Sequence, residues 1–268
     1  MRGDAFRENL RLAGDLARRD LQAKHRRSLV GSLWLVLTPL ALLGIYSVIF
    51  GGIFGVAWKV PVQQGQAAES VGFVLPFFVG LSVYLTLSDL VNSSAVLFAS
   101  KRTFVVKSPF PIWVLWVANL LRAGVHAAIL AVLVLGLALL QGRLTLAGIP
   151  GALVGVALCV LFIAGLSLLL AALGPFIGDI SEAMKLLLRV LFYATPITYP
   201  LALVPQPYRD WMWLNPLTCM VELLRNPIVF GTMPPAGALG GFALAAVVMA
   251  ALAAWVFSRV KGVIADVV

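Results

Sequence analysis

Long apolar stretches separated by short polar segments dominate this chain, and their pattern is typical of membrane-spanning helices. Several of the stretches exceed the roughly 20 residues that a helix needs to cross a bilayer. We predict six spans, at about 33–54, 71–99, 112–140, 147–177, 183–203 and 238–258. The expected fold is therefore an all-α integral membrane protein, with one transmembrane domain over residues 1–268.

The segment before the first span, residues 4–27, has a helical pattern of its own. Apolar residues recur at spacings of three and four and build one stripe, which contains Phe6, Leu10, Ala13, Ala17 and Leu21. Most of the basic residues fall off that stripe. Such an amphipathic helix lies in the plane of the membrane interface. It serves either as an anchor alone or also as the binding site of a cytoplasmic partner.

Composition and charge support a membrane protein and indicate how it is threaded. The 268 residues are 61% hydrophobic and 12% charged, whereas an ordinary soluble domain has about 25% charged residues. The net charge of +9 comes from basic residues that lie between the spans, which points to a topology signal and anionic lipid rather than nucleic acid. Fifteen of the 20 Lys and Arg residues fall on the side of both termini. The positive-inside rule therefore predicts cytoplasmic termini. The opposite loops hold only Lys59, Arg143, Arg209 and Arg225.

A few polar residues lie deep inside the predicted spans. Asp89 in the second span and Arg122 in the third lie at similar depths, and Asn119 and His126 share the face of Arg122. Intramembrane charges often mark function. Here we favour a buried Asp89–Arg122 ion pair that joins the two spans, so that exchanging the two charges should largely rescue the loss of one.

Two further patterns modify the simple bundle. Gly151 and Gly155 form a GxxxG motif in the fourth span, which predicts close helix packing inside one subunit. Residues 195–235 contain eight prolines among aromatic residues, a density that breaks regular helix. We expect short helices at the outer leaflet or dipping into it, with 204–237 as an outer-side re-entrant segment.

The chain shows no energy source or catalytic cluster of its own. The phosphate-binding pattern GxxxxGK[ST] is absent, the only histidines are His25 and His126, and the two cysteines suggest no disulfide framework. No cofactor is expected in this chain. These absences favour a channel-forming subunit driven by a separate ATPase. Two alternatives remain, an exporter of drugs or other small hydrophobic substrates and a membrane enzyme of envelope lipid or glycan assembly.

Several motifs in order along the chain resemble one known family. The N-terminal pattern RDLKxRYRxSxLGxxWxxxxP is matched at Arg19, Asp20, Leu21, Arg26, Ser28, Gly31, Trp34 and Pro39. The motif KSPFP at 107–111 and the outer-side stretches 195–205 and 215–225 are also similar. The usual FRDI reads Ile-Gly-Asp-Ile at 177–180 and lacks the arginine. The chain thus resembles the membrane subunits of bacterial polysaccharide ABC exporters, which move lipid-linked O-antigen, capsule or teichoic acid chains.

The resemblance implies partners and roles for particular residues. Two copies of the chain would pair with two ATP-binding subunits, which hold ATP and magnesium, in the bacterial inner membrane. The ATPase-subunit interface would comprise Arg19, Asp20, Lys24, Arg26, Arg27, Lys101, Arg102 and Lys107. The polymer path would comprise Tyr46, Phe50, Phe192, Tyr193 and Tyr199. The outer gate would comprise Pro196, Pro200, Asn215, Pro216, Glu222 and Arg225.

Overall fold

The computed structural model describes residues 2–25, 31–59, 70–107 and 111–267. Its longer helices are α1 (Arg2–His25), α2 (Trp34–Tyr46), α3 (Val74–Ala95), α6 (Trp113–Leu140), α7 (Gly148–Leu173), α8 (Ile180–Ala194), α10 (Pro216–Arg225) and α11 (Ala236–Val260). Short helices are η1 (Gly31–Leu33), η2 (Ser47–Ile53), α4 (Leu97–Ser100), α5 (Arg102–Lys107), η3 (Leu201–Leu203), α9 (Tyr208–Met212), η4 (Asn226–Phe230) and α12 (Ile264–Val267). Two-residue strands β1 (Trp58–Lys59) and β2 (Ser70–Val71) pair antiparallel.

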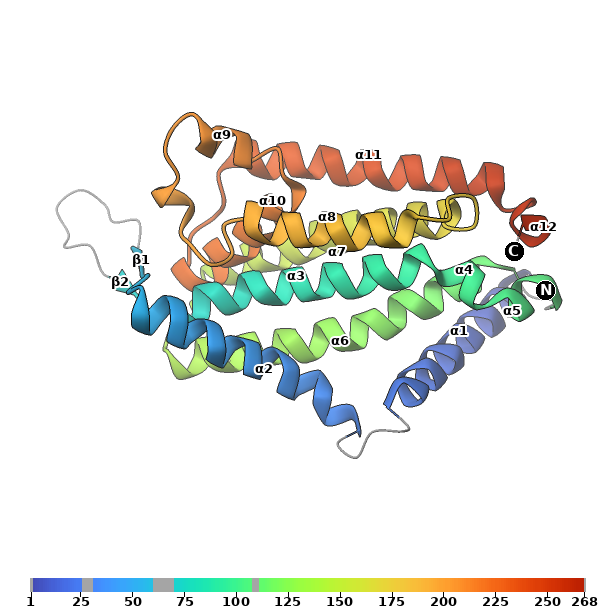
Figure 1. Cartoon of the computed structure of the whole chain (residues 1–268), viewed down its shortest axis with the longest axis horizontal. Helices are drawn as coiled ribbons and strands as arrows, with labels where there is room; N and C mark the ends of the chain where they lie inside the picture. The colour runs from blue at the N-terminus through green and yellow to red at the C-terminus, as the bar shows by residue number, and fades with distance from the viewer. Residues whose placement is uncertain (1, 26–30, 60–69, 108–110, 268) are drawn as a thin grey trace.

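The long helices form a bundle around α3 (Figure 1). Helix α3 packs against α2, α6, α7, α8 and α10, and its first half is almost entirely buried. Helix α11 lies along α7, and α1 lies against α6. The two termini lie at the same end of the molecule (Figure 1).

Five helical segments are long and apolar enough to cross a bilayer, and they correspond to five of the predicted spans. They are Trp34–Ile53, Val74–Ala95, Trp113–Leu140, Gly148–Leu173 and Ala236–Val260.

The predicted bounds of the remaining span, 183–203, are wrong. Helix α8 has 15 residues and ends at Ala194, so it is about 22 Å long and shorter than the roughly 30 Å hydrocarbon layer. The helix stops there because Thr195 precedes Pro196 and adopts an extended conformation, with φ −107° and ψ 142°. Residues 195–200 are therefore not helical, and the short helix η3 follows them.

The GxxxG motif of α7 packs closely against α10 and η4 of the same chain, and the sequence predicted close packing inside one subunit. A Cβ atom placed on Gly155 would lie 2.8 Å from the carbonyl oxygen of Leu223, and one on Gly151 would lie 3.1 Å from Cβ of Pro227. The first distance is too short for a side chain, and the second is tighter than an ordinary contact. The two glycines thus let α10 and η4 approach the backbone of α7.

A buried ion pair joins α3 and α6. Nη1 of Arg122 lies 2.8 Å from Oδ2 of Asp89, as predicted from the sequence. The same guanidinium also donates to Asn119 at 3.2 Å and to Ser93 at 3.0 Å. Nδ1 of His126 lies 3.8 Å from the Asp89 carboxylate. Arg122 therefore has three hydrogen-bond partners around the edge of its guanidinium group, and not only the one carboxylate.

Hydrogen bonds extend this network to a third helix. The amide of Asn119 donates to Ser94 at 3.1 Å, and the hydroxyls of Ser94 and Ser167 lie 2.7 Å apart. The indole of Trp116 donates to Ser167 at 3.2 Å. Because Ser167 lies on α7, the network ties α3, α6 and α7 together in the bundle interior.

A second apolar cluster holds α1 at the end of the bundle that carries the termini. Ala13, Leu16 and Ala17 of α1 are buried there. They share the cluster with residues of α4, α5, α6, α7 and α12. The predicted apolar stripe is therefore used for packing against the bundle, while Phe6 and Leu10 at its edge stay exposed. Helix α1 is described over Arg2–His25, against the predicted 4–27.

Replacement of Asp89 by Asn should lower the stability of the protein by about 3–5 kcal/mol, because it leaves Arg122 buried without its counter-charge. The structure predicts that the exchange Asp89→Arg with Arg122→Asp restores only part of this loss, since an aspartate cannot donate to Asn119 and Ser93. Thermal unfolding of the purified protein in detergent measures both effects. Full stability of Asp89→Asn would show that the pair is dispensable.

Replacement of Gly155 by Val should destabilise the protein by about 1–3 kcal/mol, because the added methyl groups would push α7 away from α10. Gly136→Val in α6 is the matched control, since nothing lies within 4 Å of a Cβ placed there. The same unfolding assay compares the two variants. Equal melting temperatures would contradict the close packing of α7 against α10.

Candidate functional site

Aromatic rings form a continuous row from α8 across α2 and α3 to the β-hairpin. The Tyr46 ring lies 5.8 Å from Phe50, 5.1 Å from Phe77 and 5.9 Å from Phe192. Neighbouring rings continue the row at similar spacings. We call this row the aromatic ladder, and its members are Tyr46, Phe50, Trp58, Phe73, Phe77, Tyr84, Phe192 and Tyr193.

The ladder contains four of the five residues predicted for the polymer path, and their side chains differ in exposure. Tyr193 is 74% exposed, and Tyr46 and Phe50 are partly buried. Phe192 is only 8% exposed because Tyr46, Tyr84 and Tyr193 surround it. In this chain Phe192 thus packs among the other rings and supports the ones that face outward, and its place on the polymer path stays a prediction.

The fifth predicted residue is Tyr199, and four further rings of the ladder were not predicted. Tyr199 is partly buried, and its hydroxyl donates to the backbone carbonyl of Tyr193 at 3.2 Å. Sequence reasoning missed Trp58, Phe73, Phe77 and Tyr84. The spacing of four between Phe73 and Phe77 puts both rings on one helical face. That spacing in the sequence predicts that the rings of Phe73 and Phe77 are neighbours.

The outer-side segment enters the bundle as the short helix α10. Asn215 caps this helix, since its Oδ1 accepts the Leu217 N–H at 3.0 Å, and Pro216 occupies the first helical position. Nδ2 of Asn215 donates to the hydroxyl of Thr195 at 2.9 Å. Helix α10 then contacts α3, α7 and α11 and is buried along most of its length. A short helix is therefore present within the predicted segment 204–237, and its place in the membrane stays a prediction.

Arg225, in the last turn of α10, is completely buried and is not in a loop as the charge count assumed. Its guanidinium donates to Glu222 at 2.6 Å, to the carbonyl of Pro196 at 2.8 Å and to the carbonyl of Pro76 at 3.1 Å. The ring of Trp58 lies 5.3 Å away. Arg225 thus joins α10, the turn after α8 and the start of α3. Of the predicted gate residues, Pro196, Glu222 and Arg225 meet here.

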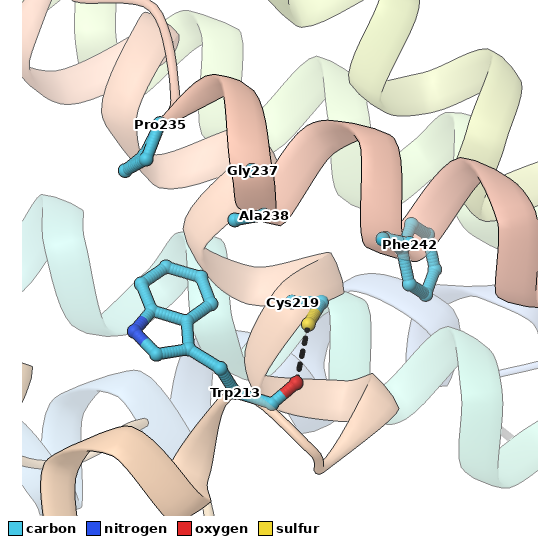
Figure 2. A pocket seen from close by; sticks show the side chains of 7 residues that line it. Trp213, Cys219, Pro235, Gly237, Ala238 and Phe242 are labelled. Carbon is cyan, nitrogen blue, oxygen red and sulfur yellow. Dashed lines mark hydrogen bonds between the residues drawn. The ribbon is translucent and has the colours of Figure 1, made fainter.

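An apolar cavity of about 280 Å³ lies between this segment and the start of α11 (Figure 2). Trp213 and Cys219 line one side, and the other residues come from the first turns of α11 and the proline before it: Pro235, Gly237, Ala238, Gly241 and Phe242. The thiol of Cys219 donates to the Trp213 carbonyl at 3.2 Å. The cavity therefore offers packing surface and no charged group.

The predicted ATPase-subunit interface lies at the end that carries the termini, and two of its members contact each other. Nζ of Lys101 lies 2.5 Å from the carboxylate of Asp20, so the pair joins α1 to the segment between α4 and α5. Arg19 and Arg102 are exposed. Lys24 and Lys107 belong to the ends of α1 and α5, whereas Arg26 and Arg27 lie outside the described residues.

Replacement of Arg225 by Met should destabilise the protein by about 3–5 kcal/mol, because it leaves Glu222 buried and uncompensated. The double change Arg225→Met with Glu222→Leu removes both charges and should recover much of that loss. Maleimide labelling of the buried Cys219, in a Cys159→Ala background, should increase in the single variant. Arg209→Gln is the control, because this partly exposed arginine also donates to backbone carbonyls, those of Ala202 and Val204. Unchanged labelling of Arg225→Met would contradict the anchoring role.

Comparison with known proteins identifies the family of this chain. The ABC-2 type transporter family matches residues 14–229. An O-antigen export system permease protein RfbA of Klebsiella pneumoniae is 23% identical over 222 residues, which cover 81% of this chain and 80% of that protein. RfbA of Myxococcus xanthus is 26% identical over 244 residues, with 90% and 89% coverage. The polysialic acid transport protein KpsM of Escherichia coli is 22% identical over 214 residues, with 80% and 79% coverage. The chain is therefore a membrane-spanning member of the ABC-2 type transporter family.

Proposed function

We propose that this chain is the permease subunit of an ATP-driven exporter that moves lipid-linked polysaccharide, an O-antigen or a capsule, across the inner membrane. The observation that carries the proposal is that permeases of polysaccharide export match it over about four-fifths or more of both chains. The aromatic ladder supports it, because sugar rings present apolar CH faces that pack on aromatic rings.

The exposure of α2 and α8 supports two copies in the working transporter. Pro39 is the only buried residue of α2, and the following η2 has none. Leu186, Leu187 and Val190 of α8 are exposed as well. A path between two copies would be lined by these helices and by the outward-facing rings of the ladder. Such a closed two-fold arrangement is the commonest one for soluble homo-oligomers.

The energy for transport would come from two ATP-binding subunits that hold ATP and magnesium. Their docking site would be the end of the bundle where α1, α4, α5, α6 and α12 share one apolar cluster. Because that cluster includes α7 as well, a displacement of α1 or α5 would be transmitted to the rest of the bundle. This end would face the cytoplasm, in agreement with the distribution of basic residues.

The rival functions are separated by where finished polymer accumulates. Deletion of the gene should leave complete polysaccharide chains inside the cell if the protein exports them. Missing synthesis would instead indicate an enzyme of envelope assembly. A normal surface polymer together with drug sensitivity would indicate an exporter of small hydrophobic compounds. ATP hydrolysis should require the purified partner subunit, and activity of this chain alone on a lipid-linked sugar would overturn the proposal.

Replacement of Tyr193 by Ala should reduce polymer export about fivefold, since one exposed aromatic contact is worth about 1 kcal/mol. The ring is 74% exposed, so its loss should leave the fold intact. Surface polymer in a complemented deletion strain measures export. Trp255→Ala in α11, an aromatic residue with 59% exposure outside the ladder, is the matched control. Equal export by both variants would argue against a path along the ladder.

A further inference from the structure

A stripe of polar side chains on α8 lies outside the packing described above, apart from Tyr193 at its end. Glu182, Lys185, Arg189 and Tyr193 follow one another at spacings of three and four residues, so they lie along one face of the helix. All four are exposed in this chain, whereas Leu188 and Phe192 point into the core. The stripe runs beside the aromatic ladder, which includes Tyr193.

If α8 starts at the membrane interface, the position of Arg189 along the helix argues against a stripe that faces lipid. Arg189 lies nine residues after Ile180, the first residue of α8, which is about 14 Å along the helix axis. That distance is close to half of the roughly 30 Å hydrocarbon layer. A charged arginine is costly there unless it faces a water-filled path or an opposite charge.

Arg189 has no counter-charge within the described part of the chain. Lys185 pairs with Glu182 at 2.6 Å, but no ion pair of Arg189 occurs among the described residues. Arg189 precedes Tyr193 by four residues on the same face of α8, and the Tyr193 ring lies 5.3 Å from Phe192. Arg189 therefore lies directly beside the ladder.

Arg189 lies closer than Tyr193 to the end of the bundle at which α8 starts. The start of α8 is at the end of the bundle where both termini lie (Figure 1). A substrate that enters from that end reaches Arg189 one helical turn before Tyr193. On this route the Glu182–Lys185 pair comes first, then Arg189 with its planar fork of donors, and the aromatic rings follow.

We propose that Arg189 binds an oxyanion, a phosphate or a carboxylate, of the transported substrate as it enters the path. Guanidinium groups hold such anions through two parallel hydrogen bonds. The inference rests on the proposed function, because it needs α8 to line the path. It assigns recognition of charge to Arg189 and recognition of sugar faces to the aromatic ladder.

Binding to the protein with its ATP-binding partner in nanodiscs of neutral lipid tests the inference. Three probes are compared: a polyprenyl diphosphate without sugar, an oligomer of sialic acid without lipid, and neutral maltoheptaose. Arg189→Gln should weaken binding of at least one anionic probe about tenfold, the effect of one charge-assisted hydrogen bond. Arg189→Lys should recover part of that affinity, and binding of maltoheptaose should not change. Arg259→Gln, a change to another cation near the same end, is the control.

The pattern of losses identifies the source of the oxyanion. Weaker binding of the polyprenyl diphosphate alone assigns Arg189 to the lipid-linked phosphate, and weaker binding of the sialic acid oligomer assigns it to carboxylates along the chain. Unchanged binding of both anionic probes overturns the inference. So does loss of the dimer by Arg189→Gln in native mass spectrometry, since Arg189 would then pair with the second copy.

The same variants separate this inference from the proposed function. If cells with Arg189→Gln export polymer at the normal rate while Tyr193→Ala reduces export, the path is supported and only the oxyanion site is wrong. If the unaltered complex exports no polymer and binds none of the three probes, the proposed function itself is wrong.

Discussion

Hydrocarbon offers no hydrogen bonds, so every polar group inside the membrane must find its partner within the protein. Two arginines meet this constraint in the structure. Arg122 is held by Asp89, Asn119 and Ser93, and Arg225 is held by Glu222 and two backbone carbonyls. Each of these two guanidinium groups bonds to several chain segments and so holds them together. The arrangement of α3, α6, α7 and α10 follows from satisfying these two groups together with the tight glycine contacts of α7.

The helices consequently differ in how firmly they are held. Helices α3, α6, α7, α10 and α11 share the polar network, the glycine contacts and most of the apolar core. Helices α2 and α8 lie on the surface of this unit and expose most of their side chains. Within the proposed transporter, this division provides a stiff frame and two helices whose outer faces are available to a partner and a substrate.

Much of the fold could be predicted from the sequence, because the apolar stretches, the GxxxG motif and the proline-rich segment each have a local physical meaning. The Asp89–Arg122 pair was also predictable, since two opposite charges at equal depth in two spans have few partners other than each other. Arg225 was misplaced because counting charges between spans cannot distinguish a loop from a re-entrant helix. The end of α8 was missed because apolar composition continues past Thr195 although Pro196 breaks the helix. The ladder depends on contacts between distant segments, which a single sequence does not reveal.

The sparse packing of α2 has a consequence for the order in which the protein is built. Helix α2 is made before the other spans that the structure describes, yet its ring contacts are with Phe77 and Phe192, which follow it in the chain. During synthesis it therefore enters the bilayer as a nearly isolated helix, secured by its own hydrophobicity. The order of insertion is thus the reverse of the order of packing. Helix α2 is inserted before the helices that it contacts, and it packs only when they are in place.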